Sequence, residues 1–123
     1  MLYLCDTCIL IDYLRGNEVI RQKLSIDRKQ CLGMSAVTYM ELMVGALNKQ
    51  EISIIKKTFA DFKIIEISDA VSSLARSLVE KYSKSHGLLI PDALIAATAI
   101  EYDTPLWTAN KKDFRFIPDI QIM

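Results

Sequence analysis

The sequence predicts an α/β protein built on a parallel β-sheet, and three observations lead to this fold class. Short apolar runs of strand length alternate along the chain with longer stretches whose apolar residues recur at helical spacing. One of these stretches, residues 91–102, is apolar nearly all round, as expected for a central helix with neighbours on most sides. No repeat, linker or low-complexity segment interrupts the order. We therefore expect a single domain over residues 1–123, with right-handed crossovers between its strands.

Composition sets limits on partners and location. Half of the 123 residues are apolar, which is enough to form a hydrophobic core that needs no disulfide or structural metal for stability. Lys plus Arg and Asp plus Glu both number 15, and this balance argues against wholesale electrostatic wrapping of nucleic acid, although it allows a local basic patch. The apolar start MLYL is too short for a signal peptide, and no apolar run approaches the roughly 20 residues of a membrane span. These features predict a cytoplasmic protein.

The first half of the chain is predicted to contain three strands and four helices. The strands are expected at 1–5, 30–34 and 64–67, and the helices at 9–15, 17–25, 36–47 and 49–62, with a polar turn at 27–29. Ser35 is a plausible N-cap for helix 36–47. The predicted apolar stripe of that helix consists of Ala36, Met40, Met43 and Leu47. Glu41 lies on the flank of the stripe, and Gly45, one turn later, would leave open space beside its carboxylate.

The second half continues the alternation. Ser68 or Asp69 is expected to cap a long helix that ends at Gly87, with His86 favourably placed at its C-terminal dipole. Pro91 suits the first turn of the apolar helix 91–102. A fourth strand is expected at 106–108, followed by a polar turn at 110–113 and an edge strand at 120–123.

Acidic residues occur where strands end or helices begin. Asp6 lies between the apolar run 1–5 and the first helix, which in a parallel α/β sheet is the crevice where ligands bind. A carboxylate in this place is also a common N-cap. Three further acids occupy comparable positions, so we expect four carboxylates to converge on one rim of the sheet: Asp6, Glu41, Asp92 and Asp113.

Such a cluster requires a cation. Two like charges 4 Å apart repel by about 4 kcal/mol at an effective dielectric constant of 20. Because no His or Cys set accompanies the acids, their oxygens favour a hard ion such as Mg²⁺ or Mn²⁺. An ion of this kind can activate a water for attack on a phosphodiester. Lys111, Lys112 and Arg115 flank the fourth acid and could hold substrate phosphates, although a solvated charged turn explains them equally well.

Three segments resemble a known family: LCDTCILIDYLRG, MSAVTYMELMVGA and IPDALIAATAIEYDTPLWTANKKDF. Together, and in this order, they look like a PIN domain of the VapC ribonuclease toxin type over essentially the whole chain. The resemblance implies a three-layer fold with a central parallel sheet of four to five strands flanked by helices. It also implies Mg²⁺- or Mn²⁺-dependent endoribonuclease activity on RNA, homodimerisation, and inhibition by a cognate antitoxin whose C-terminal segment enters the acidic groove.

The resemblance carries site roles over by position. The first three family acids and the two supporting hydroxyls correspond to Asp6, Glu41, Asp92, Thr7 and Thr108. The fourth acid stands at the position of Asn110 in some members and of Asp113 in others, so both remain candidates. Cys8 stands where many members carry Asn.

Other functions remain open. Cys5 and Cys8 form a C-x-x-C pair that could act as a dithiol oxidoreductase, although the favoured interpretation of all three cysteines, including Cys31, is small buried hydrophobes. Asp6 could serve an aspartyl phosphotransferase, but those enzymes usually carry a second acid where this chain has Cys8. A non-catalytic RNA- or protein-binding module of the same fold is the third alternative.

Overall fold

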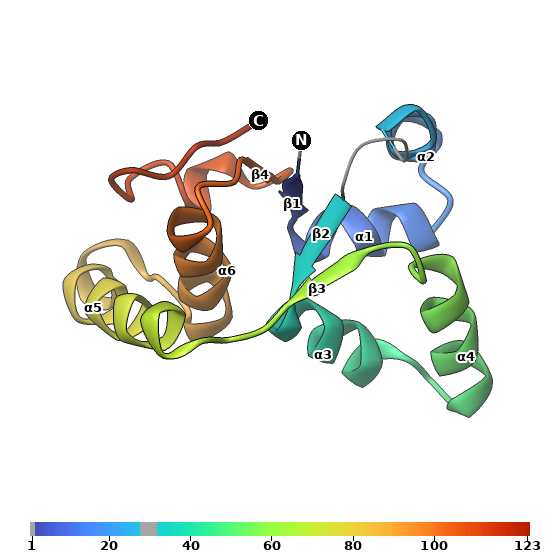
Figure 1. The fold of residues 1–123 in the computed structure, drawn as a ribbon, viewed down its shortest axis with the longest axis horizontal. Helices are drawn as coiled ribbons and strands as arrows, with labels where there is room; N and C mark the ends of the chain where they lie inside the picture. The colour runs from blue at the N-terminus through green and yellow to red at the C-terminus, as the bar shows by residue number, and fades with distance from the viewer. Residues whose placement is uncertain (1, 28–31) are drawn as a thin grey trace.

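The computed structural model describes residues 2–27 and 32–123 (Figure 1). The strands are β1 (Tyr3–Cys5), β2 (Leu32–Ser35), β3 (Lys63–Ile65) and β4 (Leu106–Trp107). The helices are α1 (Thr7–Leu14), α2 (Glu18–Asp27), α3 (Ala36–Gly45), α4 (Lys49–Thr58), α5 (Asp69–His86), α6 (Ile90–Glu101) and the 3₁₀ helix η1 (Lys111–Asp113). The predicted alternation of strands and helices is confirmed. Residues 28–31, for which the rest of a turn and the start of a strand were expected, lie outside the described residues.

The strands form one parallel sheet in the order β3-β2-β1-β4. In the centre, Leu4 of β1 lies opposite Gly33 of β2 on one side and Leu106 of β4 on the other. The expected edge strand at 120–123 is reduced to a single parallel bridge between Leu106 and Ile122. The predicted parallel sheet is therefore confirmed with four strands.

Helices cover both faces of the sheet, which gives three layers. In Figure 1, α5 and α6 lie on one side of the sheet and α1 to α4 on the other. Successive side chains of a strand point to opposite faces, so Leu4 packs into the core under α5 and α6, while Tyr3 and Cys5 pack into the core under α1, α2 and α4. Among the described residues, no helix has both the length and the apolar character needed to cross a membrane.

The helix ends follow the local signals. The Ser35 hydroxyl accepts a hydrogen bond from the Val37 backbone N–H at 3.1 Å and caps α3 as predicted. Ser68, rather than Asp69, caps α5. Gly87 ends that helix with a φ of 68°, a left-handed conformation that a residue without Cβ adopts at no steric cost.

The apolar stripe expected for α3 is only partly buried, since Met43 packs against the core under α1, α2 and α4 while other members do not. Met40 and Leu47 of the expected apolar stripe are 50% and 86% exposed, and α3 ends before Leu47. The buried residues of the helix are instead Val37, Thr38 and Leu42. Apolar residues occur on several sides of α3, so helical spacing alone does not select the side that packs inward. In the folded chain the side of α3 that packs inward, toward the sheet and α1, is the one that carries Thr38.

Candidate functional site

The four predicted acids come from four separate elements that end or begin at the same edge of the sheet. Asp6 is the N-cap of α1 directly after β1, and Asp92 lies in the first turn of α6. Glu41 lies in α3, and Asp113 ends η1, which follows β4. The Asp6 backbone N–H donates to the Trp107 carbonyl at 2.9 Å, which holds the ends of β1 and β4 together.

The electrostatics of Asp92 show that these four side chains share one environment. Burial, and after it the charges of neighbouring carboxylates, raise the pKa of the Asp92 carboxyl from 3.8 to about 6. In decreasing order of effect, these neighbours are Asp6, Asp113 and Glu41. The structure therefore brings together acids that lie up to 107 positions apart in the sequence.

Asp6 is 5% exposed, and both of its carboxylate oxygens accept hydrogen bonds. Oδ1 accepts from the Thr7 backbone N–H at 2.8 Å, which is the capping interaction considered from the sequence. Oδ2 accepts from the Thr108 hydroxyl at 2.7 Å and from the Cys8 thiol at 3.3 Å. The capping interaction accounts for the hydrogen bond to Oδ1 but not for those to Oδ2. The donors on Oδ2 fix the carboxylate in one orientation beside the end of β4.

Thr7 links Asp6 to Glu41. Its hydroxyl donates to Glu41 Oε1 at 2.8 Å and also lies 2.9 Å from the hydroxyl of Thr38. Thr38 is fully buried, and our sequence analysis did not select it. The available signal was a polar residue in a largely apolar helix, three positions before Glu41 and thus on the same side of α3.

The two candidates for the fourth acid have different contacts. Asp113 acts through its charge on Asp92. Asn110 contributes its backbone N–H, which donates to the Thr108 hydroxyl at 3.0 Å, and both Asn110 and Asp113 are exposed. This difference favours Asp113 as the fourth member of the acidic cluster and gives Asn110 a supporting contact.

The C-x-x-C pair does not have the electrostatics of a redox centre. The pKa of the Cys8 thiol is raised from 9.0 to about 11, mainly by burial and also by the Asp6 charge, and a hydrogen bond with the Ala109 backbone offsets only part of the rise. Reactive thiols have pKa values below the ordinary value, because the thiolate is the nucleophile. Cys5 is fully buried in the core. Both observations argue against a dithiol oxidoreductase.

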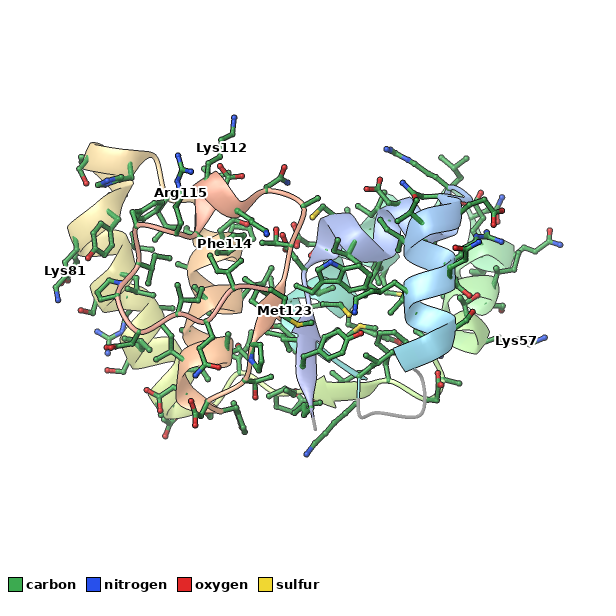
Figure 2. The ribbon with its side chains drawn as sticks, turned by 90° about the horizontal axis from the view of Figure 1, so that it is seen from above. Lys57, Lys81, Lys112, Phe114, Arg115 and Met123 are labelled. Atoms are coloured by element: carbon green, nitrogen blue, oxygen red, sulfur yellow. The ribbon has the colours of Figure 1, made fainter. Side chains whose placement is uncertain are left out.

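Basic side chains extend from the edge that carries the acids. Lys111, Lys112 and Arg115 are all exposed, and Figure 2 shows Lys112 and Arg115 at the same border of the molecule. Phe114 between them is 1% exposed and anchors the segment in the core. The basic residues thus lie within and next to the short helix that ends at Asp113.

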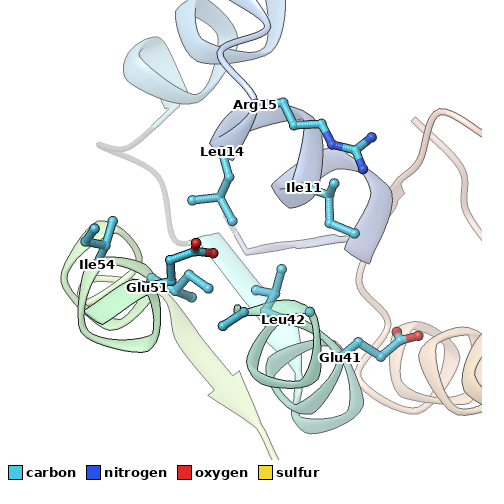
Figure 3. Close-up of a pocket in the computed structure, with 10 residues that line it drawn as sticks. Ile11, Leu14, Arg15, Glu41, Leu42, Glu51 and Ile54 are labelled. Atoms are coloured by element: carbon cyan, nitrogen blue, oxygen red, sulfur yellow. The ribbon is translucent and has the colours of Figure 1, made fainter. Parts of the chain in front are cut away.

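A pocket of about 430 Å³ opens beside Glu41, between α1, α3 and α4 (Figure 3). In Figure 3 the Glu41 carboxylate points away from Glu51, toward α6. Gly45 lines the same pocket as Glu41, and a Cβ at that position would meet no atom within 4 Å. The remaining wall is mostly apolar and includes Ile11, Leu14, Leu42, Ile54 and Ile55.

Comparisons with known proteins agree on one family. A family profile described as the PIN domain matches residues 3–119. Ribonuclease VapC19 of Mycobacterium tuberculosis is 31% identical over 121 residues, 96% of each chain. A toxin–antitoxin complex from Klebsiella pneumoniae contains a chain that is 34% identical with a TM-score of 0.79, covering 96% of this chain and 94% of that one. VapBC2 from Rickettsia felis, solved on a DNA fragment from its promoter, gives 25% identity and a TM-score of 0.85 over 100% and 98% of the two chains.

Proposed function

The chain belongs to the PIN-domain family, and from this premise we propose that it is a Mg²⁺- or Mn²⁺-dependent endoribonuclease, the toxin of a toxin–antitoxin pair. Its relatives include proteins named VapC ribonucleases, and similar solved chains come from toxin–antitoxin complexes. The observation that supports the proposal most strongly is the raised pKa of Asp92, because three other carboxylates cause part of it. Carboxylates gathered in this way repel one another unless a cation is bound between them.

The donor set suits a hard divalent cation. Asp6, Glu41, Asp92 and Asp113 offer only carboxylate oxygens, the ligands that Mg²⁺ and Mn²⁺ prefer. Within residues 2–27 and 32–123, no group of three or more Asp, Glu, His or Cys residues lies at ready-made ligand spacing. We therefore expect the ion to draw Asp92 and Asp113 toward Asp6 and Glu41, whose carboxylates are already held by the hydrogen bonds of Thr7 and Thr108. When bound, the cation supplies Lewis acidity, which lowers the pKa of a water and neutralises charge on a phosphodiester.

The chain's own residues then position the reaction. Thr108 and the Thr7 N–H hold the two oxygens of Asp6, and the Thr7 hydroxyl holds Glu41, so these carboxylates need little reorganisation before reaction. Lys111, Lys112 and Arg115 would bind the phosphates that flank the scissile bond.

The same premise indicates the partners. We expect a cognate antitoxin whose C-terminal segment enters the acidic groove, a homodimer of the toxin, and a larger complex of the two proteins in the cytoplasm. The apolar pocket beside Glu41 lies at the edge of the acidic cluster, where a bound segment could reach the carboxylates.

RNA cleavage by the purified chain tests the proposal. A 5′-labelled RNA pool is incubated with EDTA, Mg²⁺ or Mn²⁺, and Asp6→Asn and Asp92→Asn are compared with the wild type after circular dichroism has shown that both variants fold. We expect fragments only with added metal and only from the wild type. Cleavage in EDTA, or undiminished cleavage by a folded variant, would contradict the metal site. Tight antitoxin binding without any RNA fragments would indicate the non-catalytic module instead.

A further inference from the structure

We propose that Thr38 is a positioning residue, whose buried hydroxyl fixes the Glu41 carboxylate through the hydroxyl of Thr7. The inference rests on the proposed function, because it assigns Thr38 a part in holding the metal-binding carboxylates. Thr38 touches no carboxylate itself in the contacts that the structure gives. It acts through the 2.9 Å contact with Thr7, whose own hydroxyl lies 2.8 Å from Glu41 Oε1.

The number of available protons fixes the direction of these hydrogen bonds. A carboxylate has only lone pairs to offer, so the bond to Glu41 uses the single hydroxyl proton of Thr7. The contact between the two threonines must then use the proton of Thr38, with Thr7 Oγ1 as acceptor. The hydroxyls therefore form a directed chain from Thr38 to Thr7 to Glu41. Each donor in such a chain polarises the next one and strengthens its bond.

Thr7 is the residue on which two carboxylates depend. Its backbone N–H donates to Asp6 Oδ1, while its hydroxyl donates to Glu41 Oε1. Thr38 and Glu41 belong to α3, whereas Thr7 begins α1. The hydroxyl chain thus leaves α3, reaches α1 and returns to α3, and so it ties the start of one helix to the side of the other. This connection fixes the spacing between the Asp6 and Glu41 carboxylates.

Burial makes the hydroxyl of Thr38 difficult to replace. Thr38 is 0% exposed and Thr7 is 8% exposed, so bulk water does not reach the contact between them. Valine has nearly the shape of threonine but no donor. In Thr38→Val, Thr7 Oγ1 loses the donor that holds its rotamer, and Glu41 loses its fixed orientation. Removal of such an outer partner typically weakens metal affinity 10–100-fold.

Mn²⁺ binding to the purified full chain, followed by isothermal titration calorimetry, tests the inference. We expect Thr38→Val to bind Mn²⁺ at least about 10-fold more weakly, and Thr38→Ser, which keeps the hydroxyl, to match the wild type. Thr98→Val is the matched control, because Thr98 is equally buried in a helix but donates to the Leu94 carbonyl, away from the acids. Equal affinity of Thr38→Val and the wild type, or equal losses in Thr38→Val and Thr98→Val, would overturn the inference.

A double-mutant cycle separates the relay from a general packing effect. If Thr38 acts through Thr7, adding Thr38→Val to Thr7→Ala causes no further loss of Mn²⁺ affinity. If the double variant instead shows the product of the two single fold-losses, the residues act independently and the inference is overturned. If Thr38→Val does not fold, Thr38→Ala takes its place in the cycle. A wild-type chain that binds no Mn²⁺ would refute the proposed metal dependence and the relay with it. If the wild type binds Mn²⁺ but the affinity losses of Thr38→Val and Thr7→Ala add up in the double variant, the relay alone is refuted.

Discussion

The substitution Asp92→Asn should stabilise the metal-free protein while abolishing its activity. The Asp92 carboxyl has a pKa of about 6 in the folded chain against 3.8 ordinarily, mainly because of burial and then because of Asp6, Asp113 and Glu41. The folded state therefore disfavours the ionised form. The substituted amide removes the charge and keeps the shape of the side chain.

The sign and the size of the effect follow from proton linkage. Between pH 3.8 and about 6 the folded chain holds the Asp92 proton more tightly than the unfolded chain does, so stability falls as the pH rises through this window and levels off above it. A shift of about two units corresponds to about 3 kcal/mol as an upper bound, at 1.36 kcal/mol per unit. Solvent screening of this partly exposed group and the lost interaction of its charge with the α6 N-terminus reduce the net gain to about 1 kcal/mol.

Urea unfolding in EDTA at pH 7.5 and pH 4 measures this gain. We expect Asp92→Asn to be about 1 kcal/mol more stable than the wild type at pH 7.5 and close to it at pH 4, near the ordinary pKa of 3.8, where ionisation has only begun to destabilise the wild type. Added Mg²⁺ should stabilise the wild type, by about 2.7 kcal/mol at 100 times its Kd, and stabilise the variant far less. A variant that is less stable at pH 7.5, or a difference that does not change with pH, would refute the electrostatic reasoning.

Three further predictions follow from named contacts. Asp113→Asn should weaken Mn²⁺ binding by about 10-fold or more, while Asn110→Ala leaves it near the wild-type value; calorimetry distinguishes them, and the reverse order would assign the fourth position to Asn110. Gly87→Ala should lower the free energy of unfolding by about 1 kcal/mol, because alanine is strained at a φ of 68°; an unchanged urea midpoint would contradict this. The double substitution Lys112→Ala, Arg115→Ala should weaken binding of single-stranded RNA and flatten the slope of log K against log salt by about 1.4, at 0.7 per phosphate contact; an unchanged slope in fluorescence anisotropy titrations would assign both residues to a solvated turn.

Local signals made most of the fold predictable. The caps at Ser35 and Ser68 and the glycine stop at Gly87 depend on a few consecutive residues, and each was found at its expected place or at one of two adjacent candidates. The parallel sheet followed from the alternation of strands and helices. The position of Asp6 was also predictable, because the end of a parallel strand fixes where the next residue lies in the fold.

Packing decided what local patterns left open. The apolar stripe expected from helical spacing included Met40 and Leu47, yet both are exposed, because a helix with apolar residues on several sides has no preferred side until neighbouring elements select one. The selected side carries Thr38, whose role depends on a contact with Thr7, 31 positions earlier.

By itself, then, the sequence determined the order of the main strands and helices and which carboxylates stand near strand ends and helix starts, because these features depend on neighbouring residues. Only the tertiary structure decided which hydroxyl holds which carboxylate. It placed Thr108 and Cys8 on the second oxygen of Asp6 and Thr38 behind Thr7. Hydrogen bonds of this kind join residues that are distant in the chain, and no periodicity or cap encodes them until the sheet has brought its ends together.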